Sequence, residues 1–466
     1  LKYIKNLIKM NNKLFTPIIT ALVIFIFSCN NSSDVKISGT ISNQVNDSIV
    51  ISGPNVKKTI RLNENGEFLD TINISTNIYT LIHGRERTNM FLKPGYSLSI
   101  SIDNKEFDES LTYSGEGSSN NNYLAAKTLN SSLNPTDYKT MYSMDEDSFI
   151  NHINKTKTSE LDFLNSFENN NTTLDEELKS IELKEIDYKY LLSIQRYPLY
   201  YKFYAKKEPV NSDNFMKPLE DLNFINNNDY QMSQSYKSLV LSHFLNEDKM
   251  TDNSNSHFKK LIESNASDIK KDVVFQGKYS LRASSDNNEV LYNTLTNLSN
   301  DSTQISELTN LYNKLSVIKK GMKSPEFINY ENYKGGTTSL SDLKGKYVYI
   351  DVWATWCGPC IAEIPSLKKV EALYHNKNIE FVSISIDVKD RPIYNYDKWR
   401  QMIEEKSLGG VQLFADNAWN SQFTKAFVIN SIPRFLLIGP DGNIVSGDAP
   451  RPSDQKLIEL FNSLDI

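Results

Sequence analysis

The sequence predicts a chain of several domains: an all-β domain near the N-terminus, a helical region in the middle, and an α/β fold with a central sheet at the C-terminal end. Three changes of pattern predict this division. Short alternating apolar runs reach about residue 113, helical spacing continues to residue 320, and strand and helix patterns alternate from residue 324 onward. A chain of 466 residues has room for about two to four domains. We place the domain boundaries at residues 1–29, 30–118, 119–320 and 321–466.

Composition and charge exclude two broad classes of protein. Hydrophobic residues make up 39% of the chain and charged residues 23%, which is enough apolar material for sizeable cores and excludes global disorder. Lys and Arg total 51 against 57 for Asp and Glu, and no long basic stretch interrupts this balance, so we expect no nucleic-acid partner. Three cysteines are too few for a disulfide-stapled scaffold. Each cysteine can therefore be considered for a role of its own.

The N-terminal segment has the pattern of an export signal. A lysine-rich start precedes the apolar run 14–27, whose 14 residues are fewer than the roughly 18–20 that a membrane-spanning helix needs. The run ends in Ile26-Phe27-Ser28-Cys29, which resembles a bacterial lipobox. This resemblance implies cleavage before Cys29 and lipid modification of its thiol, which would hold the chain at a membrane surface. An uncleaved anchor and a cleaved secretory signal are the alternatives, and all three place the remainder of the chain outside the cytoplasm.

Residues 34–113 have the pattern of a small antiparallel β domain, either a sandwich or a half-barrel. Gly-Pro, Asn-Gly and Pro-Gly turn signals separate the strand patterns. The strand patterns include residues 35–39, 48–51, 72–74 and 98–102. No group of reactive residues stands out in this domain.

The middle region, from about residue 123 to residue 320, has apolar residues at helical spacing, for example from Ile305 to Ile318. Tyr197, Tyr200 and Tyr204 could line a binding groove, but we favour half-buried packing for them. The region matches no family that we can name.

The recognisable chemistry of the chain lies at a Cys-x-x-Cys pair in the C-terminal region. A buried strand pattern at residues 346–353 runs towards Cys357 and Cys360, and a helix is expected to follow to about Tyr374. At a helix N-terminus, unpaired N–H groups and the helix dipole favour a negative charge on the first thiol, and the thiolate is the nucleophile. The second thiol lies one turn further on the same face, within reach of a mixed disulfide. The spacing therefore predicts a redox-active dithiol.

Three other uses of these cysteines fit less well. A zinc site needs a second pair of ligands, but no other cysteine lies nearby and the five histidines are scattered. A purely structural disulfide would close a very short loop and would stabilise little. A peroxiredoxin signature requires Pro and then Thr before the reactive cysteine, whereas Ile350 and Ala354 occupy those positions.

The residues around the pair carry a family resemblance. The motif Trp-Ala-Thr-Trp-Cys-Gly-Pro-Cys at residues 353–360 resembles the active site of thioredoxins, and more closely that of the extracytoplasmic TlpA/ResA-like thiol-disulfide oxidoreductases. The resemblance covers about residues 320–466 and implies a thioredoxin-like fold. Residues 34–115 resemble, more loosely, a β domain often joined to such modules. Supporting segments are residues 324–327, 340–346, 363–365, 431–438 and the turn 440–443.

This resemblance implies roles for the reactive residues. Cys357 would be the attacking thiolate and Cys360 the resolving thiol. Asp351 matches the buried acid of thioredoxins and would exchange a proton with Cys360. Glu363 matches the active-site glutamate of the ResA-like branch. Both acids are present in this chain, so which of them acts stays open.

The resemblance also implies residues that contact the substrate. Pro433 would form a cis peptide bond beside the cysteines, Ile432 would help to select the substrate, and Trp356 would shelter the thiols. Gly358 and Pro359 match the dipeptide of reducing thioredoxins, which favours disulfide reduction.

Together these observations predict a membrane-tethered reductase of disulfides in the cell envelope, facing the periplasm or the cell surface. We expect no metal and no internal cofactor. The expected partners are disulfide-containing client proteins, a membrane thiol-redox electron donor, and the membrane itself through the lipid anchor at Cys29. Two alternatives remain: a disulfide oxidase or isomerase on the same fold, and a binding lipoprotein in which residues 34–320 carry the main function.

Overall fold

The computed structural model describes residues 34–466, except residues 55, 169–172, 247–255, 284, 286, 391, 392, 394 and 465. The expected signal segment with Cys29 lies outside the described residues. The chain divides into two compact units, one ending at Pro135 and including Phe167–Leu178, the other comprising Thr136–Ser166 and Lys179–Ile466. The domain division at residues 30–118, 119–320 and 321–466 remains our proposal. Among the described residues, no helix is both long enough and apolar enough to cross a membrane.

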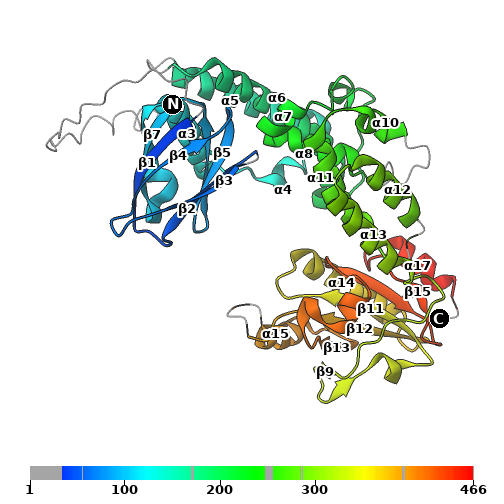
Figure 1. Ribbon diagram of the computed structural model, residues 1–466. Coiled ribbons are helices and arrows are strands. Elements are labelled where there is room, and N and C mark those ends of the chain that lie inside the picture. Colours follow the sequence, from blue (N-terminus) through cyan, green and yellow to red (C-terminus); the bar gives the residue numbers. More distant parts are fainter. Residues whose placement is uncertain are drawn as a thin grey trace. The chain divides into compact units, whose positions relative to one another are not determined.

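The first unit contains the predicted all-β domain, drawn in blue to cyan in Figure 1. Its described strands form two four-stranded sheets, in the orders β4-β1-β7-β8 and β3-β2-β5-β6. Burial alternates along the strands, as in β7, where Leu98, Ile100 and Ile102 face the core. The strands are β1 Asp34–Ser42, β2 Ser48–Gly53, β3 Val56–Arg61, β4 Glu67–Asn73, β5 Asn77–His83, β6 Glu86–Leu92, β7 Ser97–Asp103 and β8 Thr112–Glu116.

The pairing of these strands corrects one expectation. β1 pairs with β7 in parallel, so the domain is not purely antiparallel. Alternating burial identifies a strand but not its partner, which is why the pattern could not reveal this pairing. Helix α3 (Ser118–Leu133) belongs to the same unit, where the Asn121 side chain bonds both the N–H and the carbonyl of Phe91, at 2.9 and 3.0 Å.

The middle of the chain is helical, as predicted. Tyr197 is buried, and its hydroxyl donates to the carbonyl of Met144 at 2.7 Å. Tyr200 and Tyr204 pack against the same apolar cluster, which supports a packing role for these tyrosines. The helices are α4 Tyr138–Met141, α5 Glu146–Glu168, α6 Glu176–Ala205, α7 Asn227–Met232, α8 Gln234–Phe244, α10 Ser256–Glu263, α11 Ser267–Gly277, α12 Asn288–Leu298 and α13 Ser302–Ser316.

The C-terminal region forms the predicted thioredoxin-like α/β fold. Its described strands make one seven-stranded sheet in the order β10-β9-β13-β12-β11-β14-β15. β11 lies in its interior, parallel to β12 and antiparallel to β14. The strands are β9 Tyr330–Asn332, β10 Thr337–Thr338, β11 Tyr347–Trp353, β12 Ile379–Ser385, β13 Val411–Phe414, β14 Arg434–Ile438 and β15 Ile444–Ser446.

Helices cover the two faces of this sheet. α14 (Gly358–Leu373) and α17 (Gln455–Asn462) pack on the face that carries Tyr349 and Leu437. The opposite face, with Ile350, joins a buried cluster that also contains Leu295 and Ile318 of the helical region. The helical region and the α/β domain therefore share a core within the second unit. The remaining helices are α15 Tyr396–Lys406 and α16 Gln422–Ala426.

Candidate active site

The interior strand β11 brings the Cys-x-x-Cys motif to one edge of the sheet. The strand ends at Trp353, and its parallel neighbour β12 ends beside it at Ser385. Because the carboxyl ends of parallel strands lie at the same edge, the loops that follow them are neighbours. Polar residues after β11 and after β12 can therefore meet there.

Cys357 occupies the N-cap position of helix α14. Its Sγ accepts a hydrogen bond from the backbone N–H of Cys360 at 3.2 Å. The two cysteines form a disulfide, and they expose only 5% and 4% of their surface. Gly358 and Pro359, between them, are exposed. Proline fits this first helical turn, where its missing N–H would have no partner within the helix.

A buried carboxylate that we did not predict holds the loop before the cysteines. Asp387, only 1% exposed, accepts hydrogen bonds from the N–H and the hydroxyl of Thr355 at 3.0 and 2.8 Å. It also accepts from the Ser385 hydroxyl at 2.8 Å. An acid two residues after a buried strand was the available signal, but many surface loops share this pattern. Asp387 fixes the segment from which Cys357 projects.

Apolar side chains pack against the buried cluster that contains the two cysteines. The Ile432–Pro433 peptide bond is cis, which confirms that expectation. Ile432 packs against the buried cluster that contains both cysteines. Trp356 is half-buried, and its ring centroid lies 6.4 Å from that of Trp419. Trp419 comes from the loop after β13, and no motif in the sequence distinguishes it.

Asp351 lies on β11, six residues before Cys357, on the sheet face that α14 covers. The residue is partly accessible, but its Oδ1 is enclosed and has no hydrogen-bond partner in the described part of the chain. Burial, reinforced by the negative charges of Glu363 and Glu371, raises the pKa of Asp351 from 3.8 to about 8. A carboxyl group in such surroundings is favoured in its protonated form at neutral pH.

Glu363, on α14, has different surroundings from Asp351. The side chain is 9% exposed, and its two oxygens accept from the Ser453 N–H at 2.9 Å and from the Ser453 hydroxyl at 2.8 Å. Ser453 lies just ahead of α17, whose N-cap is Asp454. Ser453 therefore supplies one donor to each oxygen of the Glu363 carboxylate. The structure thus gives the two predicted acids different surroundings.

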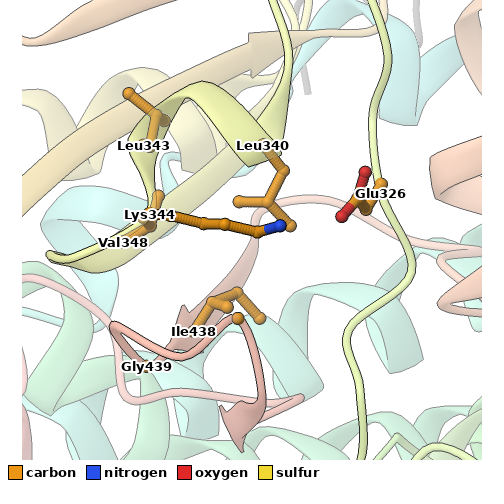
Figure 2. A pocket seen from close by; sticks show the side chains of 8 residues that line it. Glu326, Leu340, Leu343, Lys344, Val348, Ile438 and Gly439 are labelled. Carbon is orange, nitrogen blue, oxygen red and sulfur yellow. The ribbon is translucent and has the colours of Figure 1, made fainter.

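A small pocket in the α/β domain is separate from this site. Figure 2 shows it lined by Glu326, Lys344, Val348 and Ile438, among others. Val348 is near the start of β11, whereas the cysteines follow its end. The pocket volume of about 10 Å³ is near the lower limit for one water molecule. The pocket therefore offers no space for a substrate.

The C-terminal part of the chain is similar to known proteins. The family model described as redoxin matches residues 319–457. The thiol-disulfide oxidoreductase ResA of Bacillus subtilis is 28% identical over 128 residues, which are 28% of this chain and 66% of that protein. ResA of Oceanobacillus iheyensis is 30% identical over 145 residues, 29% of this chain and 68% of that protein. The solved thioredoxin domain of a Bacteroides vulgatus thiol-disulfide oxidoreductase is 26% identical, with a TM-score of 0.28, and the match covers 32% of this chain and 98% of that one.

Proposed function

Because the chain belongs to the family of ResA-like thiol-disulfide oxidoreductases, we propose that it is a membrane-tethered reductase of disulfides in client proteins outside the cytoplasm. The observation that carries this proposal is the Cys357–Cys360 disulfide at a helix N-terminus, which follows a strand that carries an acid with a pKa raised to about 8. In this reaction Cys357 attacks the client disulfide, Cys360 resolves the mixed disulfide, and Asp351 exchanges a proton with Cys360.

The first step is attack on the client disulfide by the reduced protein. The Cys357 thiolate bonds to one client sulfur, the client S–S bond breaks, and the other client sulfur leaves as a thiolate that takes up a proton from water. The free N–H groups of the first turn of α14 favour the thiolate form of Cys357. Trp356, Gly358, Pro359, Ile432 and Pro433 would contact the client around the mixed disulfide.

The second step releases the client. Cys360 transfers its proton to Asp351, its thiolate bonds to the Cys357 sulfur, and the second client sulfur leaves as a thiolate. Two electrons have then passed to the client, and the protein holds its own disulfide. In this oxidised state a pKa of about 8 keeps Asp351 mostly protonated at neutral pH, as expected of the group that received the proton from Cys360. A dithiol donor at the membrane would reduce the pair again.

The place of action rests on the sequence. The lipobox resemblance supports a lipid anchor at Cys29 and a position facing the periplasm or the cell surface. Radiolabelled palmitate should enter the wild-type chain but not a Cys29→Ala variant expressed in a bacterium.

The direction of electron flow is tested by the reduction potential of the Cys357–Cys360 pair. The full chain would be equilibrated in glutathione and dithiothreitol buffers, and its thiols would be alkylated and counted by mass spectrometry. A potential near that of thioredoxin, about −270 mV, supports a reductase. A potential near about −120 mV would instead indicate an oxidase.

Single-cysteine variants complete the test. Cys360→Ser should accumulate a mixed disulfide with clients that carry an accessible disulfide, because the resolving thiol is absent. Cys357→Ser should form no mixed disulfide. If both variants trap clients equally, the assignment of the attacking thiol is wrong.

A further inference from the structure

A cluster of three charged side chains connects the helical region to the strand that follows the cis-proline. Asp448 pairs through one oxygen with Arg434 and through the other with Arg282, whose Nη1 lies 3.0 Å from it. Arg434 is the first residue of β14, and Asp448 follows β15. Arg282 lies between α11 and α12 in the helical region. One carboxylate therefore joins two parts of the second unit.

Arg434 is the buried member of this cluster. Its side chain is only 8% exposed, and this burial lowers the pKa of its guanidinium, while Asp448 opposes that effect. An arginine removed from water is costly unless a partner compensates its charge. The position of Arg434 therefore depends on the position of the Asp448 carboxylate.

Arg434 also adjoins the loop that carries Ile432 and Pro433, which we call the substrate loop. It follows Pro433 directly and lies opposite Val352 of β11 in the sheet register. The segment that carries Asp448 is paired with the same strand, because the Ala449 N–H donates to the Phe435 carbonyl at 2.9 Å. A displacement of Arg434 would therefore move the adjacent Ile432–Pro433 peptide.

The helical region holds Arg282 in a defined position. The Asn288 side chain accepts from the Arg282 N–H at 3.0 Å and donates to its carbonyl at 2.7 Å. The neighbours Leu281 and Ala283 are both buried. The backbone of Arg282 is thus fixed at the start of α12, and its side chain reaches Asp448 from a rigid base.

We propose that Arg282 is a positioning residue for the substrate loop: by holding Asp448, and through it Arg434, it keeps Ile432 and Pro433 in the arrangement that a client protein needs. The helical region then takes part in client binding without touching the sulfur atoms. This inference rests on the proposed reductase function.

The test compares a protein disulfide with a small one. Full-length wild type and Arg282→Met would be assayed with insulin, using dithiothreitol as the electron source, and with the aromatic disulfide DTNB. The loop contacts an extended chain but hardly contacts DTNB, so the variant should raise KM for insulin about fivefold, with kcat unchanged and the DTNB rate within about twofold. A fivefold change in KM is the size expected from the loss of one partly exposed ion pair. The reduction potential of Cys357–Cys360 should stay at the wild-type value.

Matched variants separate positioning from general damage. Arg282→Lys keeps the charge and should restore KM to within about twofold of wild type, and Arg282→Gln provides a second neutral variant should the methionine variant fold poorly. Lys278→Met removes a neighbouring ion pair with Glu307, 3.2 Å long, and should behave as wild type. The inference is overturned if Arg282→Met matches Lys278→Met, or if insulin and DTNB activities fall together. A wild type that reduces DTNB but never insulin would contradict the proposed function instead.

Discussion

At the scale of single residues, Ser453 makes the surroundings of Glu363 different from those of Asp351. Glu363 accepts hydrogen bonds from the N–H and the hydroxyl of Ser453, while Oδ1 of Asp351 has no hydrogen-bond partner among the described residues. The negative charge of Glu363 helps to raise the pKa of Asp351. The sequence placed both acids near the cysteines but left their roles open. Ser453 is 90 residues from Glu363, and no local pattern links them.

The raised pKa of Asp351 predicts a pH-dependent stability. Between pH about 4 and pH about 8 the unfolded chain loses the Asp351 proton and the native chain keeps it, so the free energy of unfolding falls by up to roughly 1.4 kcal/mol per pH unit from this group. Its stabilising contribution is complete below pH about 4 and is lost as the pH rises to about 8. Asp351→Asn lacks this titration, so its free energy of unfolding relative to wild type should rise between pH 5 and pH 8.

Urea unfolding of the oxidised proteins at pH 5, 6.5 and 8 measures this difference. Tryptophan fluorescence is a suitable signal because all four tryptophans lie in the α/β domain: Trp353, Trp356, Trp399 and Trp419. Glu363→Gln serves as a control, since loss of its charge lowers the Asp351 pKa and shifts the pH window downward. A difference between Asp351→Asn and wild type that is constant with pH would show that Asp351 does not titrate in this range.

At the scale of secondary-structure elements, the sequence predicted strands and helices better than their partners. The motif placed a helix after Cys360, and α14 runs through Pro365 to Leu373, as expected. The turn at residues 440–443 joins β14 to β15, with Gly442 at φ 78°. Both features depend on neighbouring residues. Two other features depend on residues far apart in the chain: the parallel pairing of β1 with β7, and the hydrogen bonds between Asp387 and Thr355. Local spacing in the sequence therefore could not predict them.

The start of α14 predicts unequal reactivity of the two thiols. Cys357 precedes the helix and faces its free N–H groups, whereas Cys360 lies within the first turn and its own N–H donates to Cys357. In the reduced protein at pH 6.5, iodoacetamide should alkylate Cys357 at least about tenfold faster than Cys360. Mass spectrometry of the alkylated peptides measures both rates. Equal rates would contradict the helix N-terminus as the source of Cys357 reactivity, and a urea-unfolded sample supplies the reference in which the two should react alike.

At the scale of the whole molecule, the thioredoxin-like domain shares its core with the helical region. Leu295, Leu315 and Ile318 belong to the same buried cluster as Ile350 and Val352. A fragment of residues 321–466 would expose the apolar surface that these helices cover. Its fold should persist, because β11, α14 and α17 pack within the fragment, but its stability should fall.

This loss can be measured with the same tryptophan signal. If the fragment exposes about 80 Å² of apolar surface that the full chain buries, its free energy of unfolding falls by about 2 kcal/mol. For a domain of this size, that loss lowers the urea midpoint of the fragment by about 1 M. The fragment and the full chain would be unfolded in parallel at one pH. Equal midpoints would mean that the helical region adds no stability to the redox domain.

The first strand of the β domain has a mechanical consequence for a tethered protein. β1 begins at Asp34, yet it lies inside its sheet, paired over seven residues with β4 and over seven with β7. A pull on the chain ahead of Asp34 along the strand direction would load both rows of hydrogen bonds in shear, so that many bonds resist together. An edge strand would instead detach one bond at a time. If Cys29 is the point of attachment, the load from the membrane enters the molecule through this doubly paired strand, well away from the dithiol in the chain.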